Sequence, residues 1–212
     1  MSIAPSPSAT SRLGRPADRA KRAAILDAAT GSFFEHGFAA TSIEQVAADA
    51  GVSKVTVYNH FGDKRALFAA SVERECRKMR GHFSIRESGE GPIRERLKAI
   101  GEAMVAFLSR PEMIQFERRI AAETETDPEI GRAFLEAGPW RMKAAFAVFL
   151  EHAAAAGELT IDDPGIAAEQ FVSMCKGMGD LDRRFGAHSD PVGSAGRIER
   201  AVEVFLAAYG AR

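Results

Sequence analysis

Residues 53–60 combine the chemical groups with which proteins hold nucleic acids. Hydroxyl, amide, imidazole and methyl groups suit the base edges of a major groove, and ammonium and phenol groups suit phosphate oxygens. The candidate residues are Ser53, Lys54, Val55, Thr56, Tyr58, Asn59 and His60. A merely solvated polar helix face is the alternative, but apolar Val55 and Tyr58 beside Lys54 favour a binding face.

Two short helices joined by a tight turn are predicted to present these residues. Apolar side chains recur at helical spacing in residues 43–47, behind the possible N-caps Thr41 and Ser42. Gly51 supplies a left-handed stop at little steric cost, and Ser53 can cap a second helix. Two helices joined by a short turn that contains glycine form a helix-turn-helix, a corner that reads DNA.

The segment GVSKVTVYNHFGDKRALF resembles the recognition segment of the TetR family of transcriptional regulators, and the resemblance extends back to about Ala20. Its glycine, cap, threonine, tyrosine, aromatic stop and following lysine fall at the family's spacing. Val55 departs from the pattern, because many members carry glycine there. The resemblance implies phosphate contacts for Ser42, Lys54, Tyr58 and Lys64, and base contacts for Thr56, Asn59 and His60.

A basic segment precedes this motif. Residues 1–17 are rich in Ser, Pro and Ala and are predicted to form a disordered arm. Arg15 and its basic neighbours can follow a phosphate backbone or enter a minor groove, although a solvated tail is the alternative. Residues 1–80 hold twelve Lys or Arg against eight Asp or Glu, whereas residues 81–212 hold sixteen against twenty-one. Basic charge therefore lies where the motif lies.

The rest of the chain keeps helical spacing, without alternating strand patterns or repeats. We therefore expect an all-α protein of about nine helices. Its predicted parts are the arm (1–17), a helix-turn-helix DNA-binding domain (18–63) and a helical effector-binding and dimerisation domain (64–212). Within the last part, FERRIAAETETDPEIGRAFLEAGP and IDDPGIAAEQF resemble the AefR-like branch of the same family.

The two C-terminal helices carry apolar seams that alternate spacings of four and three residues. Such seams suit a four-helix bundle, and two helices from each of two subunits would make a symmetric dimer interface. A seam within one subunit's core is the alternative, but the last two helices dimerise in the TetR family. The predicted interface residues are Phe171, Met178, Leu181, Phe185, Ile198, Val202, Phe205 and Tyr209.

Large apolar side chains are also frequent between residues 104 and 174. They either fill the core alone or together line a cavity for a drug-sized apolar molecule, with Arg119 or Gln170 orienting a polar end. The predicted cavity residues are Met104, Phe107, Phe116, Arg119, Phe134, Trp140, Phe146, Phe149, Gln170 and Met174.

Arrangements for catalysis or for a cofactor are poor. His188, Ser189 and Asp190 adjoin in one loop, whereas a catalytic triad converges from separate positions. The five histidines lack metal-ligand spacing, and the two cysteines suit reduced core thiols. No apolar run approaches a membrane span, and no signal peptide is evident. We expect a cytoplasmic protein without enzymatic activity, cofactor, metal or membrane contact.

Together these features predict a homodimeric repressor that binds a palindromic double-stranded DNA operator and is released by a small hydrophobic effector. Two alternatives remain. One is a helical small-molecule sensor or adaptor with a vestigial DNA head, and the other is an activator of the same family.

Overall fold

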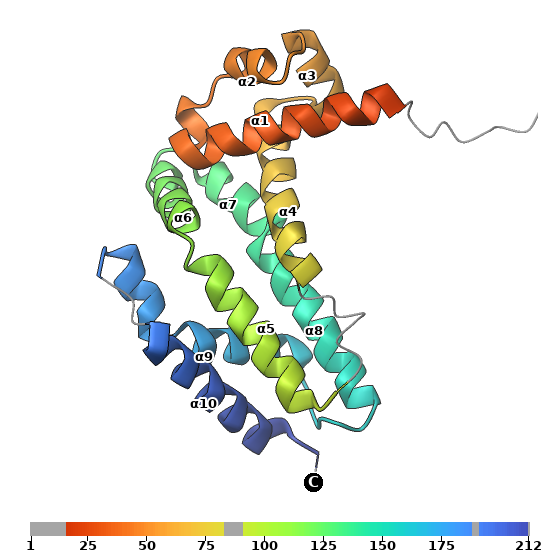
Figure 1. The fold of residues 1–212 in the computed structure, drawn as a ribbon, viewed down its shortest axis with the longest axis vertical. Coiled ribbons are helices and arrows are strands. Elements are labelled where there is room, and N and C mark those ends of the chain that lie inside the picture. Colours follow the sequence, from red (N-terminus) through yellow and green to blue (C-terminus); the bar gives the residue numbers. More distant parts are fainter. Residues whose placement is uncertain (1–15, 83–90, 188–190, 212) are drawn as a thin grey trace, which may run out of the picture.

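The computed structural model describes residues 16–82, 91–187 and 191–211, and this part of the chain is almost entirely helical (Figure 1). Its helices are α1 (Pro16–Ala40), α2 (Ile43–Asp49), α3 (Lys54–Phe61), α4 (Lys64–His82), α5 (Ile93–Leu108), α6 (Pro111–Thr124), α7 (Pro128–Ala137), α8 (Pro139–Ala155), α9 (Pro164–Arg184) and α10 (Pro191–Tyr209). An isolated antiparallel bridge joins Leu159 to Gly210. The predicted all-α class is confirmed.

Prolines and glycines set most of the helix boundaries. Pro111, Pro128 and Pro164 each occupy the first turn of a helix, where the missing N–H group has no helical partner to lose. Gly138 leaves the helical conformation, with φ −122° and ψ −88°, so the chain on its two sides forms α7 and α8. The separate α7 brings the helices of the described ranges to ten, one more than the sequence predicted.

Helix α1 bends near its C-terminal end at Gly37. Gly37 leaves the helical conformation, with φ 85° and ψ −177°, and the chain makes a further turn to Ala40. That φ value favours glycine, because a Cβ would crowd the backbone. A Cβ at this position would also collide with the carboxylate of Glu123 from α6. Glycine at the bend therefore allows a close approach of α6 to α1.

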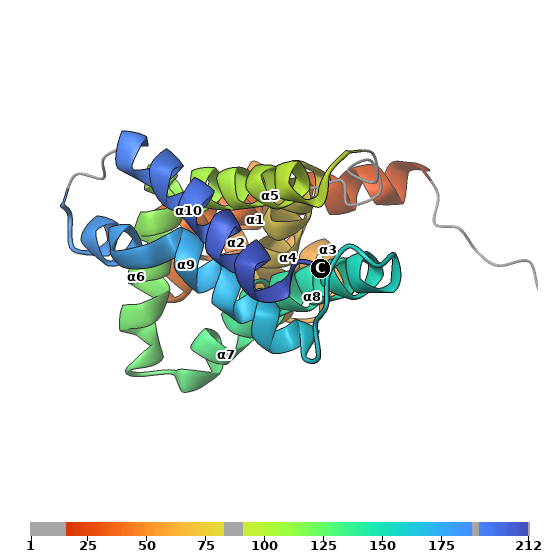
Figure 2. The ribbon, with the colours of Figure 1, turned by 90° about the horizontal axis from the view of Figure 1, so that it is seen from below.

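The helices are arranged as a head and a body (Figure 1). Helices α1, α2 and α3 form the head, and α4 runs from the head into the body. Helices α6 and α7 lie directly beneath the head, while α5, α8, α9 and α10 form the far end. The view from below shows α9 and α10 side by side (Figure 2).

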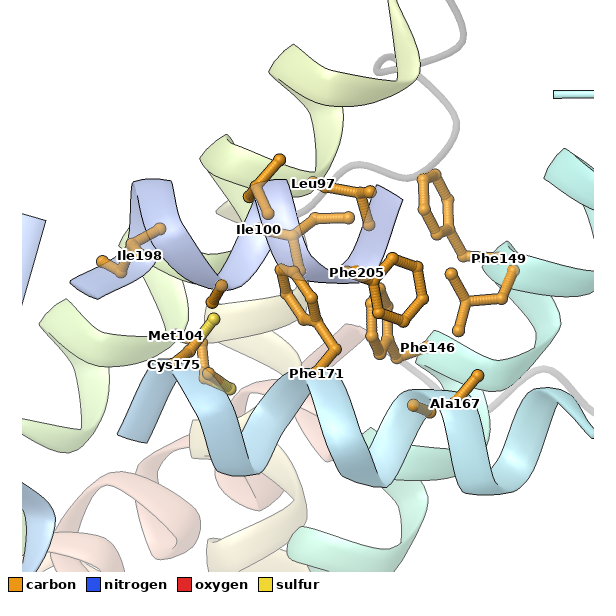
Figure 3. Packing of buried hydrophobic residues seen from close by; sticks show 14 of the residues in the cluster. Leu97, Ile100, Met104, Phe146, Phe149, Ala167, Phe171, Cys175, Ile198 and Phe205 are labelled. Carbon is orange, nitrogen blue, oxygen red and sulfur yellow. The ribbon is translucent and has the colours of Figure 1, made fainter. Parts of the chain in front are cut away.

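Two clusters of buried side chains hold this arrangement together. The first includes Phe33 and Phe68 of the head and α4, but it also contains Phe116 of α6 and Ile130 of α7. The second joins α5, α8, α9 and α10 around residues such as Phe171 (Figure 3). The core of the head is therefore completed by helices of the body.

The cysteines, the possible metal ligands and the length of the apolar helices in the described ranges bear on the expected chemistry. Cys76 and Cys175 are buried cysteines, and burial raises the pKa of the Cys175 thiol to about 12. Within these ranges no group of three or more His, Cys, Asp or Glu side chains is placed to hold a metal ion. No helix there combines the length and the apolar character needed to cross a bilayer.

Candidate DNA-binding surface and ligand cavity

The helix-turn-helix corner has the local geometry that its sequence predicts. The Ser42 hydroxyl accepts a hydrogen bond from the backbone N–H of Gln45 (3.4 Å), and the Ser53 hydroxyl accepts one from that of Thr56 (3.1 Å). Both serines thus cap their helices. Gly51 has φ 64° in the turn between them.

One side of α3 is fixed to the head. Val57 is buried, and Phe61 is half-buried with the Arg22 guanidinium 4.8 Å from its ring centroid. A cation over an aromatic face is attracted to the negative electrostatic potential of that face. These contacts orient the helix about its axis and turn its other side outward.

The outward side carries most of the residues proposed to contact DNA. Val55 is 66% exposed and Tyr58 is 39% exposed, values uncommon for such apolar groups in a helix this well anchored. The remaining residues of this exposed face are Lys54 and Asn59, together with half-buried Thr56.

Lys54 has a partner that sequence reasoning missed. Its ammonium donates a hydrogen bond to the carboxylate of Glu44 on α2 and lies 5.7 Å from the ring centroid of Tyr58. This hydrogen bond is the largest reason why the pKa of Glu44 falls to about 2. In the sequence, Glu44 resembles any acid in the first turn of a helix, where the helix dipole favours negative charge.

Three residues predicted to contact DNA make contacts within the head. Thr41 is 3% exposed and its hydroxyl donates to the carbonyl of Gly37 at 2.7 Å, so this residue is corrected to a buried structural one. The His60 side chain is 14% exposed, with Nε2 3.4 Å from Asp18 on α1. The Lys64 ammonium donates to the carbonyl of Ala39 at 3.1 Å, and burial lowers its pKa. For His60 and Lys64, contact with DNA stays a prediction. Predicted Arg15 lies outside the described residues.

The body contains a cavity of about 960 Å³ beneath the head. Its wall is formed mainly by apolar side chains of α4 to α9. The large apolar side chains that line it are Phe34 of α1 together with Val72, Ile100, Met104, Phe107, Met113, Phe116, Ile120, Phe134, Trp140, Met142, Phe146 and Phe171. Pockets that hold drug-sized molecules are of this size and character.

Six of the ten predicted cavity residues line it: Met104, Phe107, Phe116, Phe134, Trp140 and Phe146. The other four do not. Arg119 donates to the carbonyl of Phe34, and Gln170 accepts a hydrogen bond from Tyr209 (2.6 Å). Phe149 and Met174 pack in the second core cluster. Sequence reasoning missed the charged lining residues, because helical spacing does not show which charges a neighbouring helix covers. They are Glu75, Glu117, Arg132, Lys143, Glu169, Lys176 and Arg184.

Helix α6 joins the cavity to the head. Phe116 lines the cavity, and its ring stacks on that of Phe34 of α1 with centroids 4.1 Å apart. Arg119 Nη1 donates to the carbonyl of Phe34 at 2.6 Å, and a Glu123 carboxylate oxygen accepts from the N–H of Ala39 at 3.0 Å. The helix that forms one wall of the cavity therefore also holds the C-terminal half of α1.

The apolar seams of α9 and α10 divide between core and surface. Phe171, Ile198, Val202 and Phe205 are buried inside the subunit, where Figure 3 shows Phe171 and Phe205 in one cluster. Their assignment to a dimer interface is therefore wrong, because the two helices use these residues to pack on α5 and on each other. Tyr209 is half-buried against Phe205.

Other apolar residues of these helices remain exposed. Met178 (67%), Leu181 (47%) and Phe185 (84%) follow one another along the C-terminal half of α9, and Val204 (56%) lies on α10. Three large apolar groups in sequence on one helix mark a surface that a partner can cover.

Two parts of the chain match domains of known regulator families. Residues 25–71 match the bacterial regulatory proteins of the tetR family, and residues 95–211 match the C-terminal domain of AefR-like transcriptional repressors. An HTH-type transcriptional regulator of Bacillus subtilis (strain 168), YezE, is 28% identical over 149 residues, which cover 69% of this chain and 76% of that protein.

Solved structures agree. A TetR-family transcriptional regulator from Mesorhizobium loti MAFF303099 is 30% identical, with a TM-score of 0.76 over 93% of this chain and 100% of that chain. The flavonoid-responsive regulator FrrA is 33% identical, with a TM-score of 0.73 over 91% of this chain and 98% of that chain. With a helix-turn-helix head at one end and an AefR-like helical body at the other, this chain belongs to the TetR family of transcriptional regulators.

Proposed function

We propose that two copies of this chain form a repressor that binds a palindromic operator and leaves it when a small hydrophobic molecule occupies the cavity. The observation that carries this proposal is the position of α6. One side of this helix lines the cavity through Phe116, and the same helix holds α1 through Arg119 and Glu123. A ligand and the DNA-binding head thus contact the same helix.

The exposed side of α3 would enter the major groove. Lys54 and Tyr58, together with Ser42 at the start of α2, would hold phosphates and set the register. Asn59, Thr56 and the methyl groups of Val55 would contact base edges. In a symmetric dimer the two copies of α3 would enter successive major grooves, about 34–36 Å apart.

The exposed apolar residues of α9 and α10 support the dimer. A twofold interface uses the same patch on both subunits, so a strip along two adjacent helices suffices to build a four-helix contact. Leu181 of α9 and Phe185 at its C-cap would lie toward one end of the contact and Val204 of α10 toward the other, because Gly177 lies beside Arg197 and Phe171 beside Phe205. Burying these groups removes apolar surface from water, which favours association.

Release from DNA requires that the ligand bind the non-binding conformation more tightly than the DNA-bound one. A ligand in the cavity would press on Phe116 and shift α6. Because α6 holds the end of α1, the shift would change how far apart the two heads stand. The similar regulator FrrA is described as flavonoid-responsive, so flavonoids are the first class of effector to test.

The test uses the full chain with DNA from upstream of its own gene. We expect a flavonoid such as quercetin to quench the fluorescence of Trp140, the single tryptophan, which lines the cavity. Operator binding in a gel-shift assay should fall over the same concentration range, while a scrambled duplex serves as control. Trp140→Phe should lose the quenching signal but keep the release. Quenching without any change in operator affinity would contradict the proposal.

A further inference from the structure

A group of charged side chains lies at the end of the cavity where α6 meets the C-terminal half of α9. Glu117 of α6 and Lys176 and Arg184 of α9 line the cavity there. Arg184 Nη2 lies 3.2 Å from Glu117 Oε2. Asp180 lies beside them, with Oδ2 3.2 Å from Lys176 Nζ and 3.3 Å from Arg184 Nε.

Arg183 stands next to this group and is almost completely buried. Its residue exposure is 5%, and its nearest acid is Asp180, with Nη2 to Oδ1 at 3.6 Å. Within the described residues its Nε and Nη1 atoms have no hydrogen-bond partner. A buried guanidinium with two unsatisfied donors is unfavourable, because the donors have lost water without a replacement. An anionic acceptor nearby would relieve that cost.

The group carries more positive than negative charge. Three cations, Lys176, Arg183 and Arg184, stand against two carboxylates, Glu117 and Asp180. Arg118, which donates to the carbonyl of Arg183, and the exposed Asp182 cancel each other, and Arg197, which donates to the carbonyl of Lys176, adds a further positive charge. Burial also raises the pKa of Glu117, although Arg184 opposes that rise.

Charges elsewhere on the cavity wall are matched within the described residues. Lys143 lies 3.0 Å from Glu169, and Arg132 lies 2.8 Å from Glu136. The lining acid Glu75 has Arg110 at 3.7 Å. The unmatched positive charge is therefore confined to the α6–α9 end, while the rest of the cavity is apolar or neutralised.

We propose that the cavity binds an amphiphilic acid, whose apolar body lies among the aromatic side chains and whose carboxylate or sulfonate meets Lys176 and Arg184, with the buried Arg183 adding positive charge beside them. Ionised acceptors form the stronger hydrogen bonds with guanidinium and ammonium groups, and the guanidinium fork matches the two oxygens of such a headgroup. This assignment rests on the proposed function, since it takes the cavity to be the ligand site.

Two fluorescent probes with the same body test the assignment. One is 1-anilinonaphthalene-8-sulfonate, and the other is N-phenyl-1-naphthylamine, which lacks the sulfonate. Dissociation constants are measured by fluorescence titration for the wild-type chain, Lys176→Met and Arg183→Met. We expect Lys176→Met to weaken sulfonate binding about tenfold, as for one lost charge-assisted hydrogen bond, and Arg183→Met to weaken it less, through the loss of a neighbouring charge. Both should change neutral-probe binding less than twofold.

Lys143→Met is the matched control, because it removes a lysine that lines the same cavity and pairs with a carboxylate, as Lys176 does, but lies on α8 outside the α6–α9 group. It should leave the ratio of the two dissociation constants unchanged. Circular dichroism checks that Arg183→Met folds, and Lys176→Met carries the test if it does not. Equal weakening of both probes, or an equal effect of Lys143→Met, would overturn the anion site.

The neutral probe separates this proposal from the proposed function. If N-phenyl-1-naphthylamine binds and releases the operator while the sulfonate shows no dependence on Lys176 or Arg183, the anion site is wrong and the ligand-responsive repressor stands. If neither probe binds the wild-type chain, the anion site falls together with the ligand-binding role of the cavity.

Discussion

On the surface of α3, the ammonium of Lys54 is bonded to Glu44 before any DNA arrives. A phosphate that takes this lysine must displace a carboxylate of the same chain. Both side chains are exposed, so the pair is exchanged readily in water and weakens in salt. If Lys54 holds a phosphate as proposed, we expect Glu44 to lower the affinity for any DNA without regard to its sequence.

Glu44→Gln should raise affinity for operator and scrambled duplex alike, by roughly two- to fivefold, the range typical of an exposed ion pair. Fluorescence anisotropy at several salt concentrations measures the effect. In the Lys54→Met background the same substitution should gain less, because no lysine remains to be freed. A full gain in that background would show that Glu44 repels DNA directly and does not act through Lys54.

Asn59→Ala should reduce discrimination between operator and scrambled duplex by roughly 1–3 kcal/mol, if Asn59 makes a bidentate contact with a base. Tyr58→Ala should instead weaken binding to both duplexes, since phosphate contacts carry little sequence information. Titration of each variant against both duplexes gives the ratio. An unchanged ratio for Asn59→Ala would remove this residue from the base-reading set.

The sequence allowed us to predict which residues of α3 point outward. It predicted only in part which of them are free of contacts with the rest of the head. Helical spacing placed Lys54, Val55 and Asn59 on one side of their own helix. It gave no information on α1, which lies against His60, or on the carbonyl that Lys64 reaches. Those contacts join residues far apart in the chain, so no local pattern encodes them.

At the scale of helices, the approach of α6 to α1 depends on a bend that only glycine makes easily. The start of α6 follows from a local proline in its first turn. Their contact was not predicted, because Glu123 and Ala39 are 84 residues apart in the sequence.

Gly37→Ala should destabilise the protein. A side chain with positive φ costs roughly 1–2 kcal/mol, and a Cβ there would also displace Glu123. In a chain of this length the melting temperature should fall by several degrees in scanning calorimetry. Gly31→Ala in the same helix is the control, because a Cβ there meets no atom within 4 Å. It should be neutral or slightly stabilising, since alanine favours helix over glycine.

At the scale of the whole molecule, the two ends of the α9 seam have different environments. Phe171, before Gly177, is buried in the subunit core, whereas Leu181 and Phe185, after it, are exposed. Under the proposed dimer, substitutions at the first position report on folding, and substitutions at the other two report on association. Seven-residue apolar spacing could not separate the two roles, because all three residues fall on one seam that the break at Gly177 (φ 49°, ψ −160°) divides.

The double variant Leu181→Asp and Phe185→Asp should give a folded monomer with unchanged helical circular dichroism. Operator affinity should collapse, because each half-site would then be bound singly. Light scattering measures the mass. Val148→Asp, at an exposed apolar residue of α8 (46%), should remain dimeric. A dimer that survives the double substitution would place the interface elsewhere.

Phe171→Ala, in contrast, should lower the free energy of unfolding by roughly 3–5 kcal/mol, as truncation of a buried phenylalanine does. Chemical denaturation measures this loss. The mass at low denaturant should stay that of wild type if Phe171 serves only the subunit core. A variant that is fully stable but monomeric would reverse the assignment.

Phe116 belongs to the body by sequence and to the head by packing: its ring stacks on Phe34 and lies 6.1 Å from Phe68. A head cut from the body after His82 would lose this ring and leave much of its own core in water. The DNA-reading part is therefore not a detachable module, and grafting it onto the body of another regulator would require the α6 face to be carried along. Exchange of heads between relatives should succeed only where position 116 and its neighbours are exchanged with them.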